Sequence, residues 1–308
     1  MKLSIVIPVY NSEKILPTLV KKISFSLEKL FKKDLYEIIL INDCSEDNSW
    51  KVLKELSKND NNLKCFSLMN NVGQHNSIMA GLKLSKGEVV VTMDDDLQHS
   101  PDSIEKLLDG LNNGFDVCYS KFEKQKHNLW KKIGSWFNDK MANILYKKSS
   151  KVYLSSFKAL KRNIVNEIIK FEGPYVYIDG LILNSTRNIC TVNVEHFNRL
   201  SGKSNYTLKK SIGLWLIMAT SFSTTPLRMV TLFGVLTMFL CFIAIGFIFV
   251  SKINNPDMET GWASLSILIL FLGSLQFIAI GIIGEYVGRI NIKVNQKPQF
   301  VIKESLEK

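Results

Sequence analysis

The sequence predicts an α/β protein with a doubly wound, mostly parallel sheet, followed by a C-terminal hairpin of two transmembrane helices. Three observations predict this architecture. Short apolar runs alternate with helical patterns over roughly the first 120 residues, polar side chains follow several of these runs, and two long uncharged segments occur near the C-terminus.

The strands are predicted from apolar, β-branched runs bounded by turn residues. They are Leu3–Ile7, Tyr36–Asn42, Leu63–Leu68, Glu88–Met93 and Asp116–Tyr119. Helices are expected at Glu13–Phe31, from about Asn48, at Gln74–Leu84 and at Asp102–Leu111. Because helices of about ten residues or more separate the strands, the strands are expected to be parallel.

The two uncharged segments are Met229–Val250 and Trp262–Gly284. Each exceeds the roughly 18 to 20 residues that cross a bilayer. Two buried helices of a large soluble domain are the disfavoured alternative. Ser211–Leu227 is also uncharged, but it is shorter and the polar stretch Ser221–Pro226 interrupts it, so an interfacial helix is favoured over a third span.

The charges that flank the spans predict their orientation. Basic residues precede the first span and follow the second, whereas the connecting loop Ser251–Gly261 carries Lys252 against Asp257 and Glu259. The flanking basic residues are Arg199, Lys203, Lys209, Lys210, Arg228, Arg289, Lys293 and Lys297. The positive-inside rule then places both termini in the cytoplasm, in a multi-pass protein of the cytoplasmic membrane.

The composition of the chain limits which binding partners are expected. The net charge of +11 suits an anionic membrane surface, and nucleic acid is not expected because no nucleic-acid motif occurs. No signal peptide is expected, since Leu3–Val9 is too short and contains Pro8. The five cysteines have no metal-ligand spacing and are interpreted as reduced thiols.

These patterns give the expected domain organisation. It comprises a cytoplasmic α/β domain at 1–205, an interfacial helix at 206–228, the two transmembrane helices at 229–284 and a cytoplasmic tail at 285–308. The basic and aromatic segment 121–145 has two open interpretations, a solvated helix face or a surface that lies against lipid headgroups.

The most informative motif is Asp94-Asp95-Asp96-Leu97-Gln98, directly after an apolar run. Carboxylates gathered at the end of a buried strand repel one another unless a cation lies among them, and ligands of open α/β sheets bind at such strand ends. Asp94, Asp96 and the amide oxygen of Gln98 are therefore candidate ligands of Mg²⁺ or Mn²⁺. The open alternative is an acidic turn that caps the helix after Ser100-Pro101.

Several motifs together resemble a known family. Ile7-Pro8-Val9-Tyr10-Asn11, Asn42-Asp43-Cys44-Ser45 and the Asp94–His99 segment would share one edge of the sheet, and resemble the GT-A glycosyltransferases of family 2. Further motifs resemble the polyprenyl-phosphate glycosyltransferases within that family. These are Gly73-Gln74-His75-Asn76, Arg199-Leu200-Ser201-Gly202-Lys203-Ser204, Thr224–Met229 and Gly284–Ile290.

The resemblance implies an inverting transfer from a nucleotide-sugar donor, most often a UDP-sugar, to polyprenyl phosphate, with membrane lipids and a homo-oligomer, a tetramer, as partners. Donor-binding positions carried over from the family are Pro8, Tyr10, Glu13, Asp43, Asp94, Asp95, Arg199 and Ser204. Arg199 would clamp the diphosphate with its planar fork, and the metal would offset charge on the leaving group. Asp95 would point away from the metal, because adjacent strand residues face opposite sides.

The resemblance also implies an acceptor site. Lys131 and Ser135 match positions that hold the lipid phosphate, and Lys121 lies where a second basic contact is expected. The family more often has arginine at both lysine positions, so acceptor recognition would rest on point charges. Asp94, Asp96, Arg199 and Lys131 are thus the candidate catalytic residues.

Two other functions remain as alternatives. A processive polysaccharide synthase of the same superfamily is disfavoured, because two spans are too few for a polymer channel and no Gln-x-x-Arg-Trp motif occurs. A non-catalytic membrane scaffold with a degenerate transferase domain is disfavoured by the intact carboxylates. The sugar is not identified by the sequence.

Overall fold

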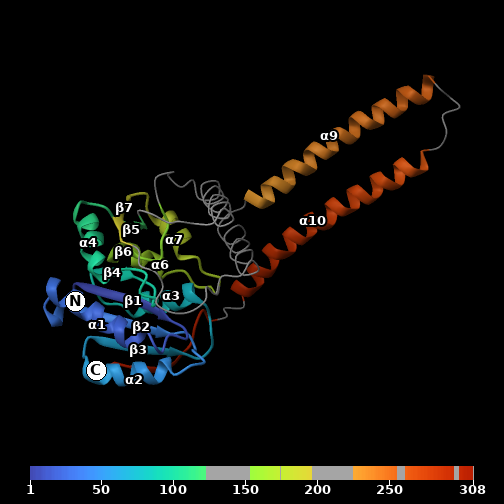
Figure 1. The fold of residues 1–308 in the computed structure, drawn as a ribbon. Helices are drawn as coiled ribbons and strands as arrows, with labels where there is room; N and C mark the ends of the chain where they lie inside the picture. Colours follow the sequence, from blue (N-terminus) through green and yellow to red (C-terminus); the bar gives the residue numbers. More distant parts are fainter. Residues whose placement is uncertain (123–152, 174, 196–224, 255–260, 295–297, 308) are drawn as a thin grey trace. The chain divides into compact units, whose positions relative to one another are not determined.

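The computed structural model describes residues 1–122, 153–173, 175–195, 225–254, 261–294 and 298–307. The chain divides into two compact units, one formed by Met1–Ser211 with Gln296–Lys308 and the other by Ile212–Asn295. The first unit is an α/β domain and the second contains two long helices (Figure 1).

The α/β unit contains an eight-stranded sheet with the order β7-β5-β6-β4-β1-β2-β3-β8. Its strands are β1 (Leu3–Val9), β2 (Tyr36–Asn42), β3 (Leu63–Leu68), β4 (Val89–Thr92), β5 (Val117–Phe122), β6 (Lys158–Lys161), β7 (Ile189–Val194) and β8 (Ile302–Leu306). Strands β1 to β4 pair in parallel, and so do β5 and β7, whereas β6 and β8 pair antiparallel with their neighbours. The predicted mostly parallel sheet is therefore confirmed, and β6, β7 and β8 are additional strands that were not predicted.

Helices cover both faces of this sheet (Figure 1). They are α1 (Leu16–Leu30), α2 (Ser49–Asn59), α3 (Gln74–Leu84), α4 (Ile104–Asn112), α6 (Arg162–Ile168) and α7 (Ile178–Ser185). Successive strand residues point to opposite faces. Ile5 and Ile7 accordingly pack with Leu19 of α1 in one core, and Val6 packs with Met79 of α3 in the other. Burial on both faces explains why the central strands are almost wholly apolar.

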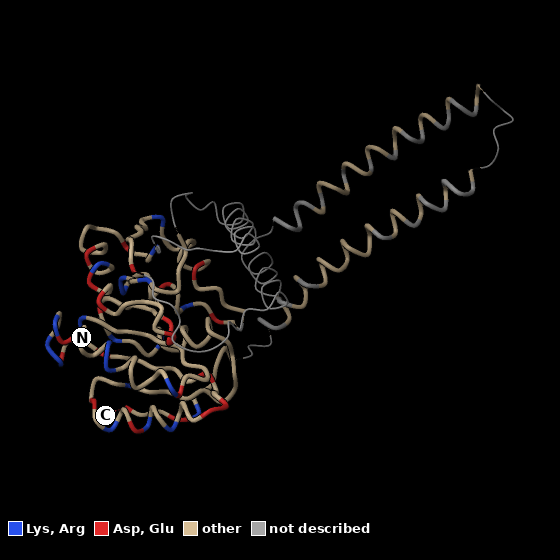
Figure 2. The backbone as a smooth tube through the Cα atoms, in the orientation of Figure 1, with Lys and Arg blue, Asp and Glu red and all other residues tan. Residues whose placement is uncertain are grey.

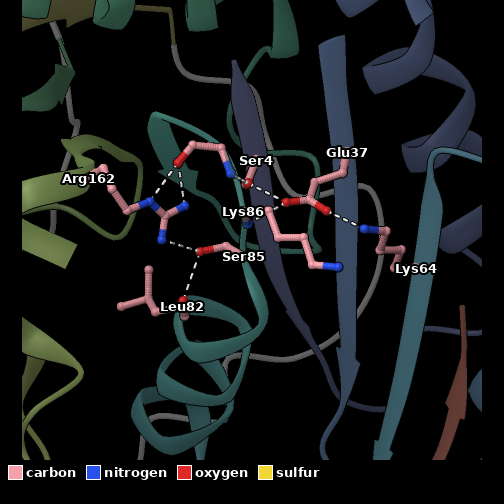
Figure 3. Close-up of polar contacts among 8 residues, drawn as sticks. Ser4, Glu37, Lys64, Leu82, Ser85, Lys86 and Arg162 are labelled. Atoms are coloured by element: carbon pink, nitrogen blue, oxygen red, sulfur yellow. Dashed lines mark hydrogen bonds and ion pairs between the residues drawn. The ribbon is translucent and has the colours of Figure 1, made fainter. Parts of the chain in front are cut away.

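A buried charged cluster lies near the amino ends of β1 and β2 (Figure 3). The Glu37 carboxylate is fully buried and accepts hydrogen bonds from Ser4 Oγ at 2.6 Å, Lys64 Nζ at 2.6 Å and the Lys86 backbone N–H at 2.7 Å. Burial is the largest single effect and raises the pKa of Glu37, but the three donors and the charge of Lys64 together outweigh it and hold the pKa below its usual value. Arg162 donates to the Gly87 carbonyl and thereby ties β6 to the turn before β4. This cluster fixes the end of the sheet opposite the candidate site.

The chain returns to the α/β unit after the long helices. The backbone N–H of Met69 donates to the Val301 carbonyl at 2.9 Å, and β8 then pairs with β3 at the edge of the sheet. Glu304 in β8 accepts a hydrogen bond from Trp50 Nε1 at 2.9 Å and pairs with Lys54 at 2.6 Å. Residues 302–306 of the expected cytoplasmic tail are thus a strand of the α/β unit.

The second unit contains α9 (Thr225–Asn254) and α10 (Trp262–Val294). Each expected span falls inside one of these helices, and α10 continues past the expected end at Gly284. The sequence of each helix contains a long uncharged run. Figure 2 shows many charged residues in the α/β unit. In the described part of the chain, one segment is long and apolar enough to cross a membrane, Phe271–Gly288, with a mean hydropathy of 1.5. Of the expected interfacial helix at 206–228, residues 206–224 lie outside the described residues, and 225–228 form the start of α9.

Candidate active site at the carboxyl edge of the sheet

Three loops at the carboxyl ends of adjacent strands β4, β1 and β2 have unusual backbone geometry. Asn11, Cys44 and Leu97 have φ angles of 55°, 53° and 58°, and they are the non-glycine residues with positive φ in the described part of the chain. A side chain in this left-handed region is disfavoured, and such residues cluster at functional sites. The geometry therefore identifies this edge as the candidate site.

Reciprocal hydrogen bonds lock the loop after β1 to the loop after β2. The Glu13 N–H donates to Asp47 Oδ2 at 3.1 Å, and the Asn48 N–H donates back to Glu13 Oε2 at 3.0 Å. The Glu46 N–H donates to Asn11 Oδ1 at 2.9 Å. In the structure the Glu13 carboxylate thus shapes the two loops on which the predicted nucleoside-binding residues lie.

Asp43 joins the end of β2 to the start of α3. Its Oδ1 accepts the Val72 N–H at 2.8 Å and its Oδ2 accepts the Gly73 N–H at 2.9 Å. Asp43 is 3% exposed, and burial raises its pKa above the usual value although both hydrogen bonds oppose the rise. Gly73 has a φ of +84°, which favours glycine. Ser77 contributes a third hydrogen bond, and the carboxylate, with four lone-pair positions in all, keeps acceptor capacity for a further donor.

Asp95 faces the loop after β1. Its Oδ2 accepts a hydrogen bond from Ser12 Oγ at 2.5 Å and one from the Tyr10 N–H at 3.2 Å. Burial raises the pKa of Asp95 to about 6, and the charges of Asp94 and Asp96 add to the rise. Asp95 therefore ties the β1 and β4 loops together.

Asp94 is bound through both of its carboxylate oxygens. Gln74 Nε2 donates to Oδ1 at 2.6 Å and Ser156 Oγ donates to Oδ2 at 2.5 Å. Asp96 is 7% exposed, and its Oδ1 accepts the Gln98 N–H at 3.1 Å. The two predicted metal carboxylates thus lie in one short loop, each with a defined hydrogen-bond donor.

The donors in this loop fit a hard divalent cation. Asp94, Asp96 and Gln98 offer only oxygen ligands, which suit Mg²⁺ or Mn²⁺. Within the described residues no group of three or more His, Cys, Asp and Glu side chains is arranged to hold a metal. A partial set of protein ligands suits a cation that also takes ligands from substrate phosphates.

Of the other predicted site residues, some lie in the described part of the chain and the rest lie outside it. Pro8 lies within β1 and Tyr10 directly follows it, at the same edge as Asp43 and Asp94. Lys121 is exposed on β5, in register with Asn193 of β7. The remaining predicted residues, Lys131, Ser135, Arg199 and Ser204, lie outside the described residues.

Sequence reasoning missed a buried polar cluster formed by residues of β5, β6 and α7. Lys158 of β6 is 2% exposed and forms an ion pair with Asp179 of α7, and Tyr119 Oη donates to the same carboxylate at 2.9 Å. The His75 ring lies edge-on to Tyr177 at 5.3 Å, and burial lowers the pKa of His75 to about 4. The one indication of this cluster in the sequence is Lys158, which lies within the otherwise apolar run Phe157–Leu160.

Comparison with known proteins identifies the class. The sequence model of the family described as Glycosyl transferase family 2 matches residues 4–169. The chain belongs to this family, and it is a glycosyltransferase. Its α/β unit is a GT-A-like domain with a mostly parallel mixed sheet.

A solved structure with a TM-score above 0.5 shows the same fold. Glucosyl-3-phosphoglycerate synthase from Mycobacterium tuberculosis, in complex with Mn²⁺, UDP and phosphoglyceric acid, matches with a TM-score of 0.54 and 16% identity, over 70% of this chain and 77% of that one. The 1–349 fragment of S. aureus TarS matches with a TM-score of 0.46 and 21% identity over 63% of this chain. The match spans 60% of that fragment and 35% of the longer TarS chain. At 16% identity the likeness to the M. tuberculosis synthase shows the fold alone.

Proposed function

We propose that the protein transfers a sugar, with inversion, from a nucleotide-sugar to polyprenyl phosphate at the cytoplasmic face of a membrane. The observation that carries the proposal is the pair Asp43 and Asp94, held by defined hydrogen bonds at the carboxyl ends of β2 and β4. Ligands of α/β sheets bind at these strand ends. The synthase from M. tuberculosis, with the same fold, was solved with Mn²⁺ and UDP-glucose.

Each end of the donor has a proposed partner. The remaining acceptor capacity of Asp43 takes a hydrogen bond from the base or ribose, and Pro8 and Tyr10 border the same space. Asp94, Asp96 and Gln98 hold Mg²⁺ or Mn²⁺, which when bound offsets charge on the leaving diphosphate. Arg199 adds a bidentate contact to that diphosphate, assisted by Ser204.

The acceptor needs little activation. A phosphate monoester has its second pKa near 6, so a lipid phosphate is largely dianionic at neutral pH and attacks without a dedicated base. Lys121, Lys131 and Ser135 are the proposed phosphate contacts. Cationic side chains reduce the electrostatic repulsion between this dianion and the diphosphate of the donor substrate.

Membrane attachment follows from the apolar helices. The segment Phe271–Gly288 of α10 supports one span, and the uncharged run Met229–Val250 within α9 is proposed as the other. The basic flanks of the two runs place the α/β unit and both termini in the cytoplasm. Cysteine labelling from outside intact cells should then reach a probe at Asn255 and not one at Ser305; the opposite pattern would contradict this orientation.

The experiment for the activity uses the full chain purified in detergent. A panel of labelled nucleotide-sugars is incubated with undecaprenyl phosphate or, as a control, with the alcohol undecaprenol. The proposal expects one sugar to enter the lipid phase with the phosphate only. Lys131→Ala should reduce lipid use about 10- to 150-fold at low lipid concentration, the loss of one contact to a charged group. Transfer to a growing polysaccharide without lipid phosphate would contradict the proposal.

A further inference from the structure

The two hydrogen bonds to Asp94 come from segments that are distant in the sequence. Gln74 begins α3, whereas Ser156 lies just before β6. One donor occupies each carboxylate oxygen, at 2.6 and 2.5 Å. A carboxylate fixed through both oxygens cannot rotate about its last torsion without losing a charge-assisted hydrogen bond.

Ser156 is itself fixed by hydroxyl groups of neighbouring strands. Thr92 Oγ1 of β4 donates to the Ser156 carbonyl at 2.7 Å. On the other side, the Ser120 N–H of β5 donates to the Phe157 carbonyl at 3.0 Å, and the hydroxyls of Ser120 and Ser155 lie 2.9 Å apart. The segment 155–157 is thus suspended between β4 and β5, with the Ser156 hydroxyl directed at Asp94.

Gln74 is held in place through the loop before α3, which is bound by Asp43. The Gly73 N–H donates to Asp43, and the Gly73 carbonyl accepts the Ser77 N–H at 3.1 Å in the first turn of α3. Gln74 follows directly and is exposed, so its amide reaches Asp94 from the open side of the site. Gln74, which supports Asp94, therefore directly follows the loop that Asp43 binds.

We propose that Ser156 and Gln74 are positioning residues that present the Asp94 carboxylate to a divalent cation in one orientation. The inference rests on the proposed function, in which Asp94 is a metal ligand. Each donor leaves one lone pair per oxygen for the cation. Residues that orient a metal ligand in this way typically contribute 10- to 100-fold to metal affinity.

The test measures Mn²⁺ binding directly, by the electron paramagnetic resonance signal of free Mn²⁺, with the full chain in detergent and saturating UDP. Ser156→Ala should weaken Mn²⁺ binding by about tenfold or more. Ser156→Thr, which keeps the hydroxyl, should restore most of the affinity. Ser155→Ala is the matched control, because its hydroxyl belongs to the same network without touching Asp94, and its affinity should stay within about twofold of the wild type.

Gln74→Met provides a second variant without a folding risk, since Gln74 is exposed. It removes the donor to the other oxygen and should also weaken Mn²⁺ binding about tenfold. Wild-type Mn²⁺ affinity in both Ser156→Ala and Gln74→Met would overturn the inference while leaving the metal site intact. A wild-type protein that binds no Mn²⁺ in the presence of UDP would overturn the metal assignment in the proposed function, and the inference with it.

Discussion

The Ser12 hydroxyl donates a hydrogen bond of 2.5 Å to the Asp95 carboxylate, across the gap between the loops after β1 and β4. These loops are 83 residues apart in the sequence. The Tyr10 N–H donates to the same carboxylate oxygen. These two hydrogen bonds hold Asp95, the middle carboxylate of the acidic run, apart from the donors that bind Asp94 and Asp96. Burial, opposed by these two hydrogen bonds, raises the pKa of Asp95 to about 6, so its protonation changes with pH in a mildly acidic range.

Asp95→Asn should change how stability depends on pH. The pKa of Asp95 is about 6 in the folded protein against an ordinary 3.8, so the folded state binds the proton more tightly. Its contribution is fully present below about pH 4 and is lost as the pH rises through about 6. Because asparagine does not titrate, the Asp95→Asn variant does not lose this stability as the pH rises.

Between pH 4 and 7.5, the free energy of unfolding of Asp95→Asn should therefore rise relative to the wild type. A shift of about two pH units sets an upper limit of about 3 kcal/mol, and partial solvation of the side chain reduces the effect. Thermal unfolding of both proteins in detergent over this range measures the difference. Parallel pH profiles for the two would contradict the raised pKa.

Removal of Lys158 should be more damaging than removal of the whole ion pair. Lys158→Met leaves the Asp179 carboxylate buried without its cation, which typically costs about 3 to 5 kcal/mol. Adding Asp179→Asn removes the charge and keeps an acceptor for Tyr119, so the double variant should regain most of the loss. Denaturant unfolding gives the coupling energy, and additive losses would show that the two residues act independently.

Gly87→Ala should destabilise the end of the sheet that Figure 3 shows. A Cβ atom at this position would lie 2.6 Å from the backbone nitrogen of Ser4, and backbone cannot move aside as a flexible side chain can. Overpacking of this kind costs about 1 to 3 kcal/mol. Gly173→Ala is the control, since its nearest neighbour would be a ring carbon of Phe171 at 3.5 Å. Equal melting temperatures for both variants would be inconsistent with the close approach.

The C-terminal strand should contribute through backbone pairing more than through its ion pair. The side chains of Lys54 and Glu304 are both 40% exposed, and exposed pairs contribute about 0 to 1 kcal/mol. Glu304→Gln should thus have little effect on the melting temperature. Truncation after Val301 removes β8 and exposes the edge of β3, so it should lower the melting temperature strongly and promote aggregation. A Glu304→Gln variant as unstable as the truncation would refute this.

The sequence predicted the elements whose signals are local. Strands β1 to β5 are apolar runs, and Asp43 and Asp94 follow two of them directly, so their place at one sheet edge follows from parallel topology. Strands β6 and β8 gave no such signal. β6 and β8 are short, carry charged residues, and depend on pairing with partners distant in the chain.

Side-chain partners were the least predictable part of the site. Ser156 reaches Asp94 only because β6 runs antiparallel beside β4, and no spacing in the sequence indicates that contact. Glu13 was expected to hold the nucleoside, and its carboxylate accepts the Asn48 N–H. Such contacts depend on loop conformations that nonlocal hydrogen bonds determine.

The central claim is that the carboxyl edge of the sheet binds a nucleoside diphosphate together with a divalent cation. Calorimetric titration of UDP into the full chain, with Mn²⁺ or with EDTA, tests it most directly. The wild type should bind UDP at least about tenfold more tightly with Mn²⁺, Asp94→Ala should lose this difference, and Asp43→Ala should bind more weakly with Mn²⁺ present. Equal UDP affinity in EDTA and Mn²⁺, unchanged in both variants, would contradict the account.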